Sequence, residues 1–199
     1  RQGMLPKSIY LCGTSLENSV RRFNKDLHVE TIAAFRFEHL WKSERNIGIG
    51  LHPQKTILVI LPFVYYESVK IIQRIIEIVS KKEMNNLIFR LKLHPDLCKD
   101  KLLSRVSPLP DNMVFEGRSI NESFSNATLV IGNTSSACVE ALAYGIPVII
   151  LGDRYGLTQN PIPFETDSFM WRLVFSSTDL FEAVLHFIDK QETEQRILL

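Results

Sequence analysis

Two glycine-rich signatures are missing from this sequence of 199 residues. It contains neither GxGxxG, the pattern of dinucleotide-binding turns, nor GxxxxGK[ST], the pattern of P-loops. Both patterns depend on glycine because the backbone must come close to phosphate groups. The sequence therefore argues against NAD binding and against P-loop phosphoryl transfer.

Metal-binding patterns are missing too. The three cysteines, Cys12, Cys98 and Cys138, are far apart, the five histidines are scattered, and there is no DxD motif. We therefore expect no metal site and no cofactor. Free thiols without close partners are typical of a reducing compartment, so we expect a cytoplasmic protein.

Strong net charge and long apolar runs are also lacking. The formal net charge is +1, which gives no reason to expect a nucleic-acid partner. No apolar run approaches the roughly 18 residues that span a bilayer. The opening residues, RQGM, do not form an apolar signal segment, and we expect the chain to be part of a longer protein.

Strand-like and helical patterns alternate along the chain, which is typical of an α/β protein with a parallel sheet. The run TILVILP at 56–62 is apolar throughout, like a strand that is buried on both faces. In ESVKIIQRIIEIVSKK at 67–82, apolar residues recur with the period of a helix. Further strands are predicted at 86–93, 112–115, 128–132 and 147–151, with helices near 97–105 and after Ser135. We predict a Rossmann-like fold of about five strands, with helices on both faces of the sheet.

The patterns divide the chain into two parts. Residues 1–50 are interpreted as the end of an N-terminal domain with a linker, and 51–199 as a Rossmann-like domain. The stretch NIGIGLHPQK at 46–55 has the two glycines and the proline of a linker. After Leu151 the regular pattern is lost until one or two amphipathic helices near the C-terminus.

Ligands of open α/β sheets bind beyond the carboxyl ends of the strands, so the loops there are the candidate sites. The loop LPFVYYES at 61–68 suits hydrophobic packing and the lining of a pocket equally well. At the next loop, Pro95 keeps His94 out of the helical region at the end of its strand. The His94 imidazole could donate to a phosphate or protonate a leaving group, or it could have a structural role alone.

The third loop begins with Glu116 and Gly117. Gly117 permits a tight turn or the close approach of a ligand. Ser119, two residues later, could simply cap the next helix.

The fourth loop has more polar side chains than a helix start needs. Asn133, Thr134, Ser135 and Ser136 follow one another where one capping residue is enough. A cap uses one hydroxyl, which leaves one or two for a phosphate at the helix start. Glu140, four residues beyond Ser136, could accept hydrogen bonds from ribose hydroxyls or could be a favourable charge near the helix N-terminus. We expect this loop on a strand that neighbours the strand of His94.

LKLHP at 91–95 and ATLVIGNTSSACVEALAYGIPVIIL at 127–151 together resemble the C-terminal half of GT-B glycosyltransferases. They resemble more narrowly the bacterial sialyltransferases and polysialyltransferases, which carry a His-Pro and a Ser-Ser motif in the nucleotide-binding domain. Capsule Kdo transferases and teichoic-acid glycerophosphotransferases are similar in the same two places. The resemblance covers about 55–151, and AAFRFEHL at 33–40 resembles the end of the N-terminal domain of surface-carbohydrate enzymes.

The resemblance implies a role for each candidate residue. His94, next to Pro95, would contact the donor phosphate and assist departure of the nucleotide, and Glu140 would bind the ribose. Glu116 and Gly117 would lie near the base. The phosphate would be bound by the polar loop residues Asn133, Thr134, Ser135 and Ser136.

The resemblance also implies the substrates. The donor would be a CMP-activated sugar acid, with a CDP- or UDP-linked sugar as the next choice. The acceptor would be a glycan or a lipid-linked glycan of capsule or lipopolysaccharide biosynthesis. A full-length enzyme of this kind can associate peripherally with a membrane.

One motif of the sialyltransferases is missing. Their N-terminal domain carries an acidic-acidic-glycine triplet that supplies the general base, and this sequence has no such triplet. We therefore expect the chain to bind nucleotide without catalysing transfer alone. Two alternatives stay open: a non-catalytic nucleotide-sugar-binding or assembly module, and a nucleotide-sugar 2-epimerase-like enzyme, which would need an SGG-like turn where this chain has NTSSA.

Overall fold

The computed structural model describes residues 6–14, 16–34, 37, 38, 40, 55–163 and 166–198, with side chains up to Asp189. The chain forms two compact units, 1–45 with 163–165, and 46–162 with 166–199. Residues 46–54, most of the expected linker, and residues 35, 36 and 39 of the stretch 33–40 lie outside the described residues.

The first unit is a small β-α-β motif. Its strands β1 (Ser8–Cys12) and β2 (His28–Ile32) pair in parallel, and helix α1 (Glu17–Phe23) connects them. No residue of α1 is buried, and the Phe23 side chain is largely exposed. A two-stranded sheet of this size is marginal by itself.

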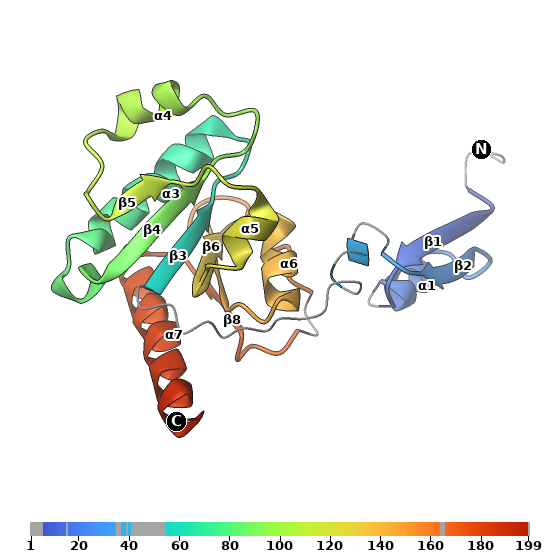
Figure 1. Ribbon diagram of the computed structural model, residues 1–199. Coiled ribbons are helices and arrows are strands. Elements are labelled where there is room, and N and C mark those ends of the chain that lie inside the picture. Colours follow the sequence, from blue (N-terminus) through green and yellow to red (C-terminus); the bar gives the residue numbers. More distant parts are fainter. Residues whose placement is uncertain are drawn as a thin grey trace. The chain divides into compact units, whose positions relative to one another are not determined.

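The second unit is built on a six-stranded parallel sheet (Figure 1). The strands are β3 (Lys55–Ile60), β4 (Leu87–Lys92), β5 (Met113–Phe115), β6 (Leu129–Gly132), β7 (Val148–Leu151) and β8 (Trp171–Val174). Their order in the sheet is β5-β4-β3-β6-β7-β8, and all neighbouring strands are parallel. The predicted parallel α/β sheet is confirmed, with one strand more than the sequence predicted.

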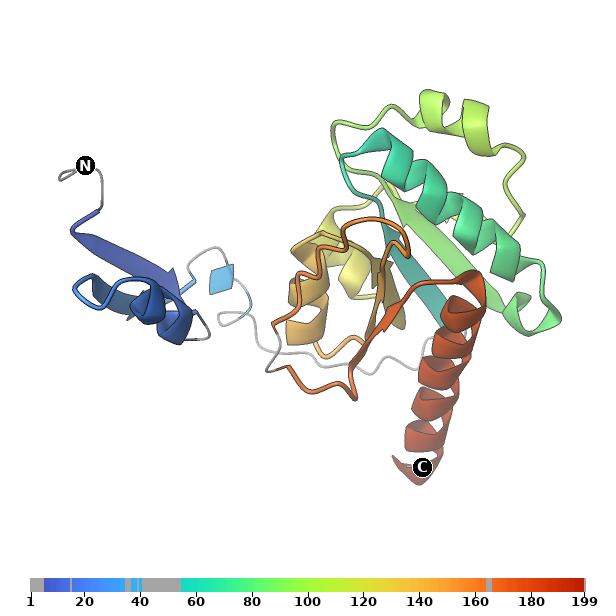
Figure 2. The ribbon, with the colours of Figure 1, turned by 180° about the vertical axis from the view of Figure 1, so that it is seen from behind.

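Helices cover both faces of this sheet, as predicted, and the two layers are seen from behind in Figure 2. The helices are α3 (Tyr65–Val79), α4 (Lys99–Val106), α5 (Ile120–Phe124), α6 (Ala137–Ala143) and α7 (Ser177–Leu198), with a short 3-10 helix, η2 (Lys82–Met84). Helices α3, α4 and α7 pack on one face, where Ile72, Leu102 and Val184 belong to the larger apolar core. Helices α5 and α6 pack on the other face, where Phe124 and Ala141 belong to a second core.

The central strands are buried because their side chains are apolar on both faces. Ile57 to Ile60 of β3 and all four residues of β6 are buried. In β4 burial alternates: Phe89 and Leu91 are fully buried towards the first core, while Arg90 is half-buried on the opposite face. The charged side chains of β4 thus face the side of the sheet that α5 covers.

The C-terminal helix α7 is a single helix rather than two, and its first three turns join the larger core through Leu180, Val184 and Phe187. None of the described helices is both long and apolar enough to cross a membrane.

Candidate functional site

The strand order creates a topological switch point between β3 and β6. Numbered along the chain from β3, the order is 3-2-1-4-5-6, so the connections run outward in opposite directions from β3 and β6. Ligands of open α/β sheets bind at the carboxyl edge beside such a point. The loops after β3 and β6 therefore flank the position where the fold favours a ligand.

The loop after β6 carries the four predicted polar residues, and side-chain hydrogen bonds link Asn133, Thr134 and Ser135 to their surroundings. The Ser135 hydroxyl accepts a hydrogen bond from the Ala137 amide, the first of α6, at 3.3 Å, and Ser135 precedes the N-cap residue Ser136. The Asn133 side-chain amide donates to Glu67 Oε2 at 3.0 Å, and Asn133 is 9% exposed. Thr134 Oγ1 lies 3.5 Å from Asn133 Oδ1. The expected side-chain cap is not formed at the N-cap residue of α6; instead the Ser135 hydroxyl binds one amide at the helix start, and the asparagine links the loop to α3.

The glycine before this loop is required for packing rather than for a left-handed turn. A Cβ on Gly132 would lie 2.5 Å from Cys138 Sγ, and Gly132 has no positive φ. Burial raises the pKa of the Cys138 thiol to about 12. Gly145, after α6, does adopt the left-handed conformation, with φ +77°, which is typical of a helix end.

Glu140 lies on α6 within the first helical turns and is buried to 8% exposure. Its amide donates to the Ser136 carbonyl at 3.2 Å, which places it one turn after the polar loop. Its assignment as a ribose ligand stays a prediction.

His94 lies in the loop between β4 and α4, with 40% of its side chain exposed. Its Nδ1 accepts a hydrogen bond from the Asp96 amide at 3.3 Å and lies 3.4 Å from Asp96 Oδ2. In the neutral imidazole that accepts this bond, Nε2 carries the hydrogen. Among the described residues nothing hydrogen-bonds to Nε2, so this nitrogen can donate to a ligand.

Strand β3 separates His94 from the polar loop, contrary to the expectation that their strands are neighbours. Val59 of β3 pairs with Leu91 on one side and Ile131 on the other, so both loops leave the sheet at the same edge. The two loops are therefore about 10 Å apart, twice the spacing of neighbouring strands.

The segment after β3 bridges this gap. The Phe63 ring packs edge-on against His94, with ring centroids 6.0 Å apart. Glu67, in the first turn of α3, reaches the polar loop on the other side. The sequence left this segment undecided between packing and a pocket, and the structure places it at the centre of the candidate site.

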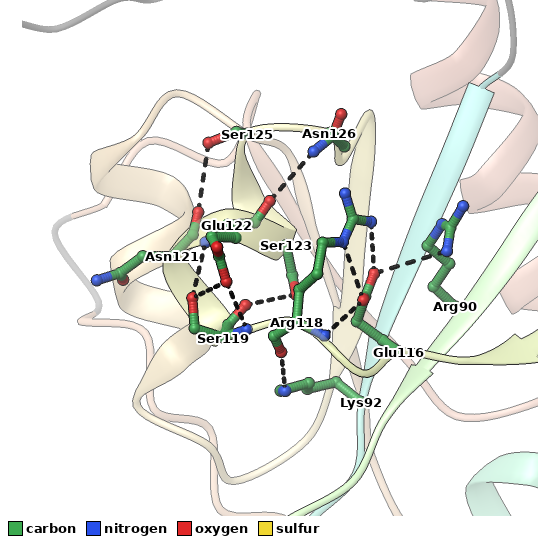
Figure 3. A network of polar contacts seen from close by, with 10 residues as sticks. All are labelled: Arg90, Lys92, Glu116, Arg118, Ser119, Asn121, Glu122, Ser123, Ser125 and Asn126. Carbon is green, nitrogen blue, oxygen red and sulfur yellow. Dashed lines mark hydrogen bonds and ion pairs between the residues drawn. The ribbon is translucent and has the colours of Figure 1, made fainter.

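Glu116 belongs to a closed network on the face that α5 covers (Figure 3). Its side chain is 3% exposed, and both carboxylate oxygens accept hydrogen bonds from the Arg118 guanidinium, at 3.0 and 2.6 Å. The Arg118 amide donates to the same carboxylate at 2.9 Å, and Arg90 lies 3.8 Å away. The Arg118 side-chain hydrogen bonds lower the pKa of Glu116 to about 2.

The rest of this loop is also explained by local structure. Ser119 and Glu122 form a capping box at the start of α5, as the sequence suggested for Ser119. Lys92 donates to the Arg118 carbonyl, which joins the loop to β4. Gly117 has no positive φ, and a Cβ there would meet no atom within 4 Å, so the backbone does not require glycine. That Glu116 and Gly117 lie near a nucleobase stays a prediction.

A small cleft opens beside the polar loop. It is lined on one side by Asn133 and Thr134 and on another by the loop between β7 and β8, with Gly152, Asp153, Thr158 and Gln159. The third side is α3, with Glu67, Lys70 and Arg74. In the part of the chain that the structure describes, no group of three His, Cys, Asp or Glu side chains could hold a metal ion.

No protein-family model and no curated protein sequence matches this chain. Solved structures do match. TarM, a GT-B glycosyltransferase, superimposes with a TM-score of 0.63 at 17% identity, over 93% of this chain and 37% of TarM. A putative UDP-N-acetylglucosamine 2-epimerase from Listeria monocytogenes superimposes with a TM-score of 0.58 at 16% identity, over 88% of this chain and 49% of the epimerase. The fold is that of the GT-B proteins.

At these identities the likeness establishes the GT-B fold, and this chain spans less than half the length of either protein. Sequence patterns placed His94 and the polar loop at the same edge of the GT-B domain, where the structure has them. They missed Glu67, Lys70 and Arg74. The signal was available: the three charges are three and four positions apart on an amphipathic helix, and such positions share one side of a helix.

Proposed function

We propose that residues 55–198 form the donor-binding half of a GT-B glycosyltransferase of surface polysaccharide biosynthesis. The observation that carries this proposal is the polar loop 133–136 at the switch point between β3 and β6. A hydroxyl- and amide-rich loop at that position suits the phosphate of a nucleotide sugar. The proposed donor is a CMP-activated sugar acid.

Each proposed role follows from the chemistry of the side chain. His94 Nε2 donates to the donor phosphate and assists departure of the nucleotide, because the Asp96 amide already occupies Nδ1. Asn133, Thr134, Ser135 and Ser136 bind the same phosphate with hydroxyl and amide donors. Glu140 accepts from the ribose hydroxyls. Glu116 and its neighbour Gly117 lie towards the base, with Glu116 supporting the loop through Arg118.

The first unit is proposed to be the end of an N-terminal domain. This proposal is supported by the exposed apolar surface of the two-stranded motif. The side chains of Tyr10, Leu16 and Phe23 are each more than half exposed. An apolar groove between α1 and the strands is lined by Ile9, Val20 and Leu27 among others. Such a surface suits continued packing against further structure. That structure would supply the general base and the site for a glycan or lipid-linked acceptor.

Calorimetric titration of the chain with CMP, CDP and UDP tests the proposal. We expect CMP to bind more tightly than UDP, and His94→Ala to weaken CMP binding. His28→Ala, which changes an exposed histidine of the first unit, is the matched control and should leave binding unchanged. Failure of all three nucleotides to bind contradicts the proposal.

A 2-epimerase-like enzyme is the second candidate, favoured by the TM-score of 0.58 to the Listeria protein. Incubation of the chain with UDP-N-acetylglucosamine, followed by chromatography of the sugar, distinguishes the two. Formation of the epimer supports the second candidate. Nucleotide binding without transfer, even when the rest of the full-length protein is present, indicates a non-catalytic binding module.

A further inference from the structure

We propose that α3 supplies three positioning residues to this site, Glu67, Lys70 and Arg74, which hold the two loops on either side of the cleft. The inference rests on the proposed function, because it assumes that the nucleotide binds at the edge of the sheet where the cleft lies. None of the three was assigned a role by the sequence patterns. Each contacts a different residue of the carboxyl edge through a hydrogen bond.

Glu67 holds the loop after β6. Its Oε2 accepts from Asn133 Nδ2 at 3.0 Å, and the partner Asn133 is buried. Asn133 comes two residues before Ser135, whose hydroxyl accepts from the first amide of α6, so a fixed Asn133 also fixes the path by which the chain enters α6. A hydrogen bond to an ionised carboxylate is stronger than one between neutral groups.

Lys70 and Arg74 hold the loop after β7. Arg74 donates to the Gly152 carbonyl at 2.7 Å, and Lys70 Nζ lies 3.2 Å from Asp153 Oδ2. Asp153 also accepts from the Tyr155 amide at 3.0 Å, which closes a turn within the loop. Hydrogen bonds from the Tyr155 amide first, and from Lys70 next, lower the pKa of Asp153 from its usual value, as expected for a carboxylate that accepts two hydrogen bonds.

The packing of this second loop is close as well. A Cβ on Gly152 would lie 2.5 Å from the Phe175 ring and 3.1 Å from Thr158 Oγ1. The Thr158 hydroxyl accepts from the Asp153 amide at 3.0 Å. The loop is thus closely packed at Gly152, near its start, and Arg74 of α3 contacts the loop at the same residue.

One helix therefore supports both walls of the cleft, and it is anchored in the larger core through Ile72, Ile75 and Val79. Binding groups held in place before the ligand arrives lose less conformational freedom on binding. Glu67, Lys70 and Arg74 thus act through the loops. Loss of Glu67 is expected to loosen the first loop and weaken nucleotide binding with little change in overall stability.

Hydrogen exchange of the whole chain tests the Glu67 contact separately from ligand binding. In Glu67→Ala we expect the Ala137 and Cys138 amides to exchange about tenfold faster, and CMP affinity to fall by about the same factor. Glu67→Gln retains an acceptor for Asn133 and should stay within about threefold of wild type in both measurements. Glu83→Gln, an exposed glutamate just beyond α3, is the matched control.

Lys70→Met tests the second loop in the same experiment. Exchange of the Asp153 and Tyr155 amides should rise about twofold at low salt and not at about 1 M salt, because the pair is exposed and screened. The Glu67→Ala effect should persist in salt, since its partner Asn133 is neutral.

The outcomes separate the two proposals. If wild type binds CMP and Glu67→Ala changes neither exchange nor affinity, the positioning role is overturned and the proposed function stands. If wild type binds no nucleotide, the proposed function is overturned and exchange alone decides whether Glu67 holds the loop. Should Glu67→Ala fail to fold, Asn133→Ala must accelerate exchange at the same two amides, and unchanged exchange there overturns the inference.

Discussion

Two glutamates near the carboxyl edge of the sheet, Glu116 and Glu67, have opposite surroundings. Glu116 is almost fully buried, and the guanidinium of Arg118 occupies both of its oxygens. Glu67 is half-buried beside a cleft and, among the described residues, contacts the Asn133 amide through one oxygen. A buried carboxylate whose two oxygens both accept hydrogen bonds stabilises the fold. A carboxylate at a cleft that can still accept further hydrogen bonds can contribute to a ligand site.

The largest expected effect concerns the acid stability that Glu116 provides. Its pKa is lowered from 4.5 to about 2 in the folded chain. The ionised form is therefore favoured by folding, and its contribution is present above the unfolded pKa and lost as the pH falls from about 4.5 towards 2. This amounts to at most about 3 kcal/mol.

Urea unfolding at pH 7, 5 and 3 measures this contribution. Glu116→Gln should be less stable than wild type at pH 7, and the difference should shrink towards pH 3. Glu83→Gln, which changes an exposed glutamate, should show no such convergence. A constant difference between Glu116→Gln and wild type across the pH range would show that the ion pair is not the cause.

A smaller effect, on ligand affinity rather than stability, is expected at His94. His94→Ala removes the proposed phosphate donor and should weaken CMP binding about tenfold, which is the scale of one hydrogen bond to a charged group. Because 40% of the side chain is exposed, the free energy of unfolding should change by less than about 1 kcal/mol. Calorimetry and urea unfolding check the two parts, and a large stability loss with unchanged affinity would make His94 structural.

The smallest effects are expected at two serines that bind amides at helix starts, Ser119 and Ser135. Ser119→Ala breaks a capping box and should cost about 1 kcal/mol of stability. Ser135→Ala breaks one longer bond, 3.3 Å to the Ala137 amide, and should cost about 0.5 kcal/mol. Only Ser135→Ala should also weaken nucleotide binding, so equal affinity in both variants would argue against a ligand role for Ser135.

The strands of the GT-B domain were predictable where burial is complete. The apolar runs of β3, β6 and β7 show their burial directly in the sequence. Strand β8 was missed because it follows a long irregular stretch and is not a continuous apolar run, with Arg172 exposed within it. Its position depends on pairing with β7, which a local pattern does not contain.

The candidate site was predictable only as separate loops. His94 and Ser135 could be placed at strand ends, but the strand between them follows from the order of the sheet. The helical spacing of Glu67 and Lys70 indicates that they share one side of α3, but their partners lie 66 and 83 positions away, and no local pattern identifies those partners. The arginines around Glu116 were likewise not expected, since Arg90 comes from another strand.

The contact between Gly132 and Cys138 has a practical consequence. Cys12 and Cys98 are exposed, while Cys138 is fully buried where α6 packs on the end of β6. A thiol with so high a pKa is a poor nucleophile until it reaches water. With the two outer cysteines replaced by serine, the rate at which an alkylating reagent modifies the chain would report how often α6 lifts away from the sheet, and so how long the polar loop keeps its shape.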